Sequence, residues 1–173
     1  MVMTSRVRTM APDDVIPMNV ENVLMSSQGP IVLLAPKTEA GTVSDRVLPI
    51  FIDQTQALNI QLALEGQLSP RPMTHDLFSQ VLNEMGAIVD RVVIEELTQS
   101  TFYASLYIQV ERTDKASIKK FDARPSDCIA LAVRVGAPIH VTQKLMGQAS
   151  ILRKDVGPVP VTEDEPDDLG VSR

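Results

Sequence analysis

The sequence predicts an α+β fold: one compact domain with a mainly antiparallel or mixed β-sheet and three to four helices. Strand-like segments occur in blocks of three that helices divide, which does not fit a strict alternation of strands and helices. The 173 residues suit a single domain, and 44% hydrophobic against 22% charged residues is close to the globular average. The chain can therefore bury a sizeable core.

The first block contains three β-like stretches separated by turn-forming residues: Val15–Met25, Ile31–Ala35 and Val47–Ile52. A helix follows, with Asp53 as its predicted N-cap. It runs through Glu65, and Gly66 closes it in the position that favours a left-handed residue.

A polar loop, Gln67–Met73, leads to a second helix that Thr74 is predicted to cap and Gly86 to end. Its apolar residues recur at helical spacing and form one stripe, made of Leu77, Phe78, Val81, Leu82 and Met85. This stripe predicts an amphipathic helix.

The second block starts with a hairpin and ends with the most apolar helix of the chain. Its strands are Ala87–Leu97, Thr101–Arg112 and Ser117–Ala123, with Thr98–Ser100 as the hairpin turn. The helix Ser126–Val135 is apolar nearly all round, which is typical of a helix in the middle of a core. Gly136 stops it, and a short strand, Pro138–Val141, and a last helix, Thr142–Ala149, complete the prediction.

The net charge of −6 is distributed unevenly. Residues 155–173 hold six acids against Arg173, whereas residues 1–154 hold 15 basic and 16 acidic side chains. We therefore predict a flexible segment 1–14, a folded domain 15–154 and an acidic, disordered tail 155–173. A nearly neutral domain does not hold long nucleic acid by bulk charge, so phosphate binding would require a local cluster.

The composition excludes several classes of protein and site. No apolar run approaches the roughly 18 residues of a membrane span, and the N-terminus lacks a signal-peptide core, so we expect a cytoplasmic protein that does not contact membranes. The nucleotide-binding patterns G-x-G-x-x-G and G-x-x-x-x-G-K-S/T are both absent from the sequence, and we expect no organic cofactor. The single cysteine, Cys128, lies in an apolar run and is interpreted as an inert core thiol. Catalysis would then depend on carboxylates, arginines or His75.

Two polar clusters, Arg71–Asp76 and Asp122–Asp127, stand where helices begin. Helix N-termini attract anions, an arginine there can bind a phosphate with two N–H groups, and nearby carboxylates can hold a divalent cation. The structural alternative is the commoner one: Thr74 and Ser126 would cap the helices, and Asp76 and Asp127 would complement the helix dipoles. The residues alone leave both interpretations open.

Other polar and aromatic residues have two readings each. His75 could act as a general acid or base, or as a capping residue. Glu65 could face the loop that contains Arg71, or be a solvated acid of the last helical turn. Tyr103 and Tyr107 share one face of a strand and could stack on a base, although cross-strand packing is the commoner use.

Five ordered motifs resemble the bifunctional nuclease domain family. They are Leu48-Pro49-Ile50-Phe51-Ile52, Ala63-Leu64-Glu65-Gly66, Pro70-Arg71-Pro72-Met73-Thr74-His75-Asp76-Leu77, Thr101-Phe102-Tyr103-Ala104, and Asp122-Ala123-Arg124-Pro125-Ser126-Asp127 followed by Ile129-Ala130-Leu131-Ala132. The resemblance runs from about Val15 to Ala149. It implies a compact, oligomeric α+β domain with nuclease activity on RNA and DNA, as described for plant members, and it supplies no agreed catalytic residues.

The leading hypothesis is a nuclease that hydrolyses RNA and DNA with little sequence preference. The candidate catalytic residues are His75, Asp76 and Asp127, and the candidate substrate-binding residues are Arg71 and Arg124. The candidate ligands for a divalent metal, Mg²⁺ or Mn²⁺, are Glu65, Asp76, Asp122 and Asp127. This hypothesis expects the two helix N-termini to approach each other, within one chain or across a homo-oligomer, for which a dimer is favoured. The alternative is a non-catalytic oligomeric module that binds a small anionic ligand or a protein partner.

Overall fold

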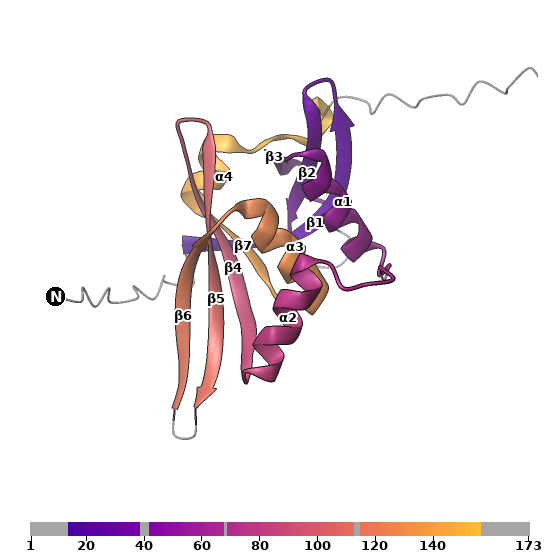
Figure 1. Cartoon of the computed structure of the whole chain (residues 1–173). Coiled ribbons are helices and arrows are strands. Elements are labelled where there is room, and N and C mark those ends of the chain that lie inside the picture. Colours follow the sequence, from indigo (N-terminus) through magenta and orange to yellow (C-terminus); the bar gives the residue numbers. More distant parts are fainter. Residues whose placement is uncertain (1–13, 39–41, 68, 113–114, 157–173) are drawn as a thin grey trace, which may run out of the picture.

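The computed structural model describes residues 14–38, 42–67, 69–112 and 115–156 (Figure 1). The strands are β1 (Val15–Ser26), β2 (Gly29–Pro36), β3 (Arg46–Phe51), β4 (Ala87–Thr98), β5 (Thr101–Arg112), β6 (Lys115–Ala123), β7 (Ile139–Thr142) and β8 (Ile151–Leu152). The helices are α1 (Gln54–Leu64), α2 (Thr74–Glu84), α3 (Pro125–Val135), α4 (Gln143–Ala149) and a 3₁₀ turn, Arg153–Asp155. The predicted segment 1–14 and tail 155–173 lie outside the described residues, except for Asp14, Asp155 and Val156.

The strands form one sheet in the order β6-β5-β4-β7-β1-β2-β3-β8. All neighbouring pairs in the described sheet are antiparallel except β4 and β7, which run parallel. This arrangement confirms the predicted α+β fold with a mixed sheet and four α-helices. Within the described residues, no helix has the length and apolar character that crossing a membrane requires.

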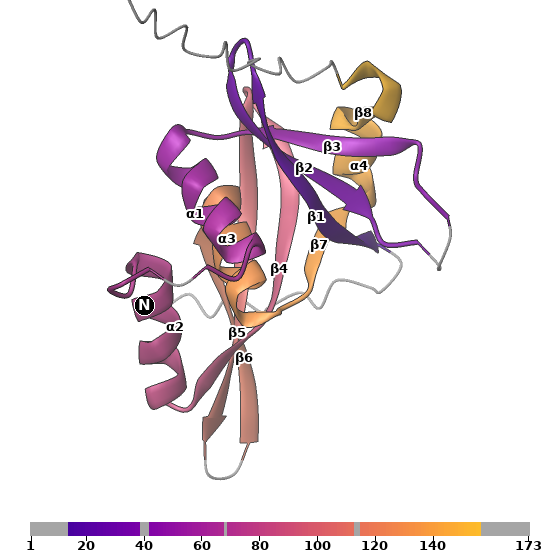
Figure 2. The ribbon, with the colours of Figure 1, turned by 90° about the vertical axis from the view of Figure 1, so that its right-hand side faces the viewer.

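Helix α3 lies at the centre of the fold. Figures 1 and 2 show α1, α2 and α3 on one side of the twisted sheet, and α3 packs against both other helices and against β4 and β5. Its residues from Cys128 to Ala132 are all buried. The prediction of a core helix is therefore confirmed, and burial of its apolar side chains contributes to holding the two halves of the sheet together.

The predicted start of α1 is confirmed and the predicted starts of α2 and α3 are wrong by one or two residues. Asp53 Oδ1 accepts from the Gln56 amide at 2.8 Å, and Gln56 Oε1 accepts from the Asp53 amide at 3.0 Å, which is a complete capping box. The other N-caps are Met73 and Arg124, in place of Thr74 and Ser126.

Both corrections have a local cause. At α2 the Asp76 carboxylate reaches back to the Met73 amide at 2.9 Å, so the side chain that satisfies this amide comes from inside the helix. At α3 the first helical residue is Pro125, whose fixed φ suits that position and whose missing N–H costs nothing there. At its other end, Gly136 adopts a left-handed φ of 69°, as predicted for the stop of this helix.

The hairpin turn between β4 and β5 lies where it was predicted, whereas β8 was not predicted. Gln99 and Ser100 both have positive φ, 48° and 62°, which is the signature of the two-residue turn whose twist matches antiparallel strands. Strand β8 has two residues, which pair with Arg46 and Val47 of β3. So short a strand is defined by its partner and leaves no periodic pattern in the sequence.

Candidate functional site

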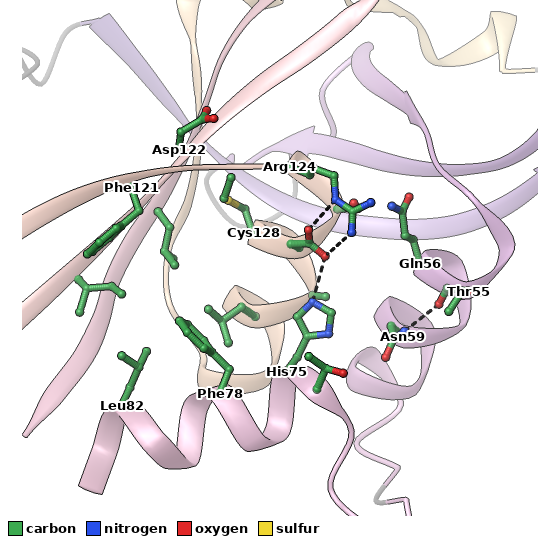
Figure 3. Close-up of a pocket in the computed structure, with 18 of the residues that line it drawn as sticks. Thr55, Gln56, Asn59, His75, Phe78, Leu82, Phe121, Asp122, Arg124 and Cys128 are labelled. Atoms are coloured by element: carbon green, nitrogen blue, oxygen red, sulfur yellow. Dashed lines mark hydrogen bonds and ion pairs between the residues drawn. The ribbon is translucent and has the colours of Figure 1, made fainter. Parts of the chain in front are cut away.

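The first turns of α2 and α3 meet, so the two predicted clusters come together within one chain. His75 Nε2 of α2 lies 3.3 Å from Asp127 Oδ1 of α3 (Figure 3). A proline stands at or just before the start of each helix, Pro72 before α2 and Pro125 as the first residue of α3. Its fixed φ restrains the direction in which the chain enters the helix. The sequence hypothesis of neighbouring helix N-termini is thus met without a second subunit.

Arg124 completes this group, and we name His75, Arg124 and Asp127 the charged cluster. Arg124 donates through Nε to Asp127 Oδ2 at 2.7 Å and through Nη2 to Asp127 Oδ1 at 3.2 Å. The Asp127 carboxylate, by this bond and by its charge, raises the pKa of Arg124 further, so the guanidinium stays positive. Its side chain is nevertheless 67% exposed. The charged cluster therefore presents a cation at the protein surface.

The charged cluster lies in a pocket of about 780 Å³ (Figure 3). One half of this pocket is an apolar groove between α2 and the strands β5 and β6, lined by Phe78, Leu82, Leu106, Ile108, Phe121 and Leu131. The other half is polar and is formed by the start of α1, with Asp53, Thr55, Gln56 and Asn59. The charged cluster stands between these halves.

Asp76 belongs to a different network, although it is adjacent to His75 in sequence. Its Oδ1 accepts from Arg134 Nε at 2.7 Å, and Arg134 also donates through Nη1 to the carbonyls of Asn59 and Ala130, each at 3.0 Å. Arg134 is 9% exposed and links α1, α2 and α3. Burial alone would raise the pKa of the Asp76 carboxyl, but the Met73 amide and Arg134 outweigh it and hold that pKa below its usual value.

The remaining candidate residues do not converge on Asp127. Glu65 accepts from Gln61 and Gln67 side chains at 2.9 and 2.8 Å at the end of α1. Asp122 borders the pocket, but Figure 3 shows its side chain on the opposite side of β6 from that of Phe121. The cause is its pairing with Ser105, which lies on the other face of the sheet. Arg71 is exposed in the loop before α2 and is not among the described residues that line the pocket.

This placement bears on the proposed metal ligands. Among the described residues, no three His, Cys, Asp or Glu side chains are grouped so that they could hold a metal ion. The one proposed ligand within the charged cluster, Asp127, already accepts from Arg124 and His75. The described donors thus do not fit a metal ion held by this chain alone, and a divalent cation stays a prediction that activity assays must test.

Sequence reasoning missed the aromatic side chains of the pocket. Phe78 and Phe121 are 41% and 46% exposed and enter the pocket from α2 and β6. Phe78 looked like an ordinary member of an amphipathic stripe, and Phe121 was not singled out. Of the two tyrosines considered for stacking, Tyr107 is buried with the Arg91 guanidinium 4.1 Å from its ring centre, so its ring is engaged in packing across strands. The sequence feature that could have indicated the aromatic wall of the pocket is Phe121, which stands between two charged residues, Lys120 and Asp122.

Cys128 also lies at the pocket, where we expect it to be unreactive. The side chain is buried, and this burial, reinforced by nearby carboxylates, raises the pKa of the thiol to about 12. Because the thiolate is the reactive form, a disulfide reagent at pH 8 should label the folded protein no faster than it unfolds and label the denatured protein completely. Rapid stoichiometric labelling of the folded protein would contradict this interpretation.

Fold and site together define a single α+β domain whose largely apolar pocket carries a few convergent charged groups, the arrangement typical of a ligand or substrate site. The chain belongs to the bifunctional nuclease domain family, whose sequence pattern matches residues 34–154.

Individual relatives agree with this assignment. An uncharacterized protein of Mycobacterium tuberculosis (strain H37Rv) is 42% identical over 111 residues, which are 64% of this chain and 63% of that protein. Bifunctional nuclease 2 of Oryza sativa subsp. japonica is 30% identical over 124 residues, 72% of this chain and 37% of the rice protein. Bifunctional nuclease 2 of Arabidopsis thaliana is 30% identical over 109 residues, 63% and 32% respectively. The matches thus span less than two thirds of the mycobacterial relative and about a third of the plant relatives.

Proposed function

We propose that this chain hydrolyses phosphodiester bonds of RNA and DNA with little sequence preference, and that it does so at the charged cluster. The observation that carries the proposal is the exposed Arg124 guanidinium, which is held in place by Asp127 at the pocket. A guanidinium has five N–H donors, and Asp127 uses two of them. The other three remain available to bind a phosphate while the Arg124–Asp127 pair stays intact.

Asp127 is the candidate general base. Its carboxylate lines the pocket beside Arg124, where it can accept a proton from a water molecule or a ribose hydroxyl that attacks the bound phosphate. The positive guanidinium would stabilise the negative charge that builds up on the phosphate oxygens during attack. The N-terminus of α3 favours the same negative charge.

His75 would act through Asp127. Its Nε2 faces the Asp127 carboxylate, and its Nδ1 is buried with no hydrogen-bond partner among the described residues. Neither nitrogen therefore meets a phosphate directly. An Nε2–H group can donate to the carboxylate and fix its orientation. We therefore assign His75 as a positioning residue.

The test is a cleavage assay with the purified full chain. End-labelled single-stranded RNA, single-stranded DNA and duplex DNA are each incubated with Mg²⁺, with Mn²⁺ or with EDTA, and the products are resolved on a gel. We expect cleavage of both RNA and DNA at low ionic strength, weakening as salt rises because the contact between Arg124 and the phosphate is electrostatic. The nearly neutral folded domain adds no bulk positive charge that would offset this loss. Comparing the cleavage rates with Mg²⁺, with Mn²⁺ and with EDTA shows whether the reaction requires a divalent cation. Binding without cleavage in every arm would contradict the proposal and support the non-catalytic alternative.

A further inference from the structure

The apolar groove has a shape and lining that the proposed reaction at the charged cluster does not use. Phe78 on α2 and Phe121 on β6 enter the groove from opposite walls, and Figure 3 shows Leu82 beside Phe78. Both phenylalanines keep over two fifths of their surface exposed, and no residue of α2 is fully buried. Exposed aromatic surface of this kind in a pocket indicates a binding site.

The two ends of the pocket differ in a way that matches one class of ligand. The groove offers apolar and aromatic surface, and Arg124 stands next to it as an exposed cation. A nucleotide has the same two parts: a flat ring system and, one sugar away, a phosphate. The pocket volume of about 780 Å³ lies within the range of roughly 300–1,000 Å³ of small-ligand sites.

The polar half of the pocket contains a further unsatisfied group. Asn59 is 9% exposed and lines the pocket. The nitrogen of its side-chain amide, Nδ2, donates to the Thr55 carbonyl at 2.9 Å, which leaves the amide oxygen, Oδ1, to be considered. This Oδ1 is buried and has no partner among the described residues. A buried acceptor without a donor is costly, and a bound molecule with a hydroxyl or amino group would supply one.

We propose that the groove between Phe78 and Phe121 binds one unpaired base next to the phosphate held by Arg124, which makes single-stranded nucleic acid the substrate class. This inference rests on the proposed function for the phosphate position. In a duplex, neighbouring base pairs cover both faces of each base, so these rings have no base face to contact. An unpaired strand can turn one base into the groove, and stacking on aromatic side chains tolerates any sequence.

A second copy of this chain is the other possible occupant, and the geometry favours a different place for it. On α2, Phe78 and Leu82 line the pocket, whereas Leu77, Val81 and Met85 form the neighbouring row and do not. The second row is also exposed, between 45% and 73%. A partner helix can cover that outer row without filling the groove, so self-association and base binding are separable by mutation.

The binding experiment uses a short DNA strand with phosphorothioate linkages, which resist hydrolysis, and one 2-aminopurine whose fluorescence falls on stacking. We expect quenching when the full chain binds this strand and none when the strand is annealed to its complement. Phe78→Leu and Phe121→Leu keep an apolar side chain but lose the ring, so each should weaken binding about tenfold. Phe121→Tyr should restore it. Phe51→Leu is the matched control, since Phe51 on β3 is 54% exposed and is not among the described residues that line the pocket.

The outcomes separate this inference from the proposed function. Quenching that both leucine variants weaken, in a protein that cleaves no strand, upholds the base site and overturns the nuclease assignment. Cleavage of single strands and duplex at equal rates, unchanged in both leucine variants, overturns the base site alone. Sedimentation is measured on every variant. A leucine variant that dissociates a dimer while the quenching is unchanged shows that a second copy covers the groove, which also overturns the inference.

Discussion

Asp127→Asn is expected to lower the rate of RNA and DNA cleavage by about 10²–10⁴-fold, the usual contribution of a general base. Asparagine has nearly the same size and its carbonyl can still accept from Arg124, but it carries no charge and cannot take up a proton. The loss should appear in kcat more than in KM, because Arg124 still binds the phosphate. Initial rates on end-labelled single-stranded RNA and DNA, measured across substrate concentrations, check this prediction.

The control for this prediction is Asp45→Asn. Asp45 is an exposed carboxylate just before β3 and is not among the residues that line the pocket. Its replacement makes the same change in net charge and should leave the rate within about twofold. Circular dichroism of both variants establishes that they are folded. If Asp127→Asn retains the wild-type rate, the observed cleavage arises elsewhere, in another site or a contaminating enzyme.

The sequence located this site better than it assigned roles within it. Arg71-Pro72-Met73-Thr74 and Arg124-Pro125-Ser126-Asp127 look alike, because each starts a helix with local chemistry. In the structure they differ, since Arg134, far along the chain, binds Asp76 while the nearer Arg124 binds Asp127. Which carboxylate faces the pocket is therefore decided by a partner on another turn of α3. No local pattern around residue 76 contains that information.

The limits of the helices could be predicted from the local sequence, whereas the order of the strands could not. Helix limits such as Asp53 and Gly136 follow from capping groups and from a left-handed φ, which are properties of a few consecutive residues. The order of the strands is a long-range property. Strand β7 inserts between β4 and β1, although β1 lies near the start of the described chain and β7 near its end. The alternation of Phe121 with Lys120 in the sequence indicates which face of β6 is apolar. It does not predict the pocket, which also requires α2 to lie opposite that face.

Arg134→Ala is expected to destabilise the domain by about 3 kcal/mol, near the lower end for breaking a buried ion pair because Asp76 keeps some contact with water. The change removes one guanidinium that satisfies the Asp76 carboxylate and two carbonyls, those of Asn59 and Ala130. Urea unfolding followed by circular dichroism measures this loss. Lys144→Ala is the control: Lys144 is exposed on α4, and its removal should change the free energy of unfolding by less than about 0.5 kcal/mol.

The pH dependence of the free energy of unfolding shows whether Arg134 stabilises the domain through its ion pair with Asp76. Burial opposes ionisation of Asp76, but the Met73 amide and Arg134 overcome it and hold its folded-state pKa below the usual value of an aspartate. A carboxyl with a depressed pKa contributes stability above its unfolded-state pKa and loses that contribution as pH falls through its folded-state pKa. From pH 5 down to pH 2.5, wild type should therefore lose more stability than Asp76→Asn, which has no charge to lose. Arg134→Ala should resemble Asp76→Asn in this range. Parallel curves for all three proteins would show that Arg134 stabilises the domain through the Asn59 and Ala130 carbonyls alone.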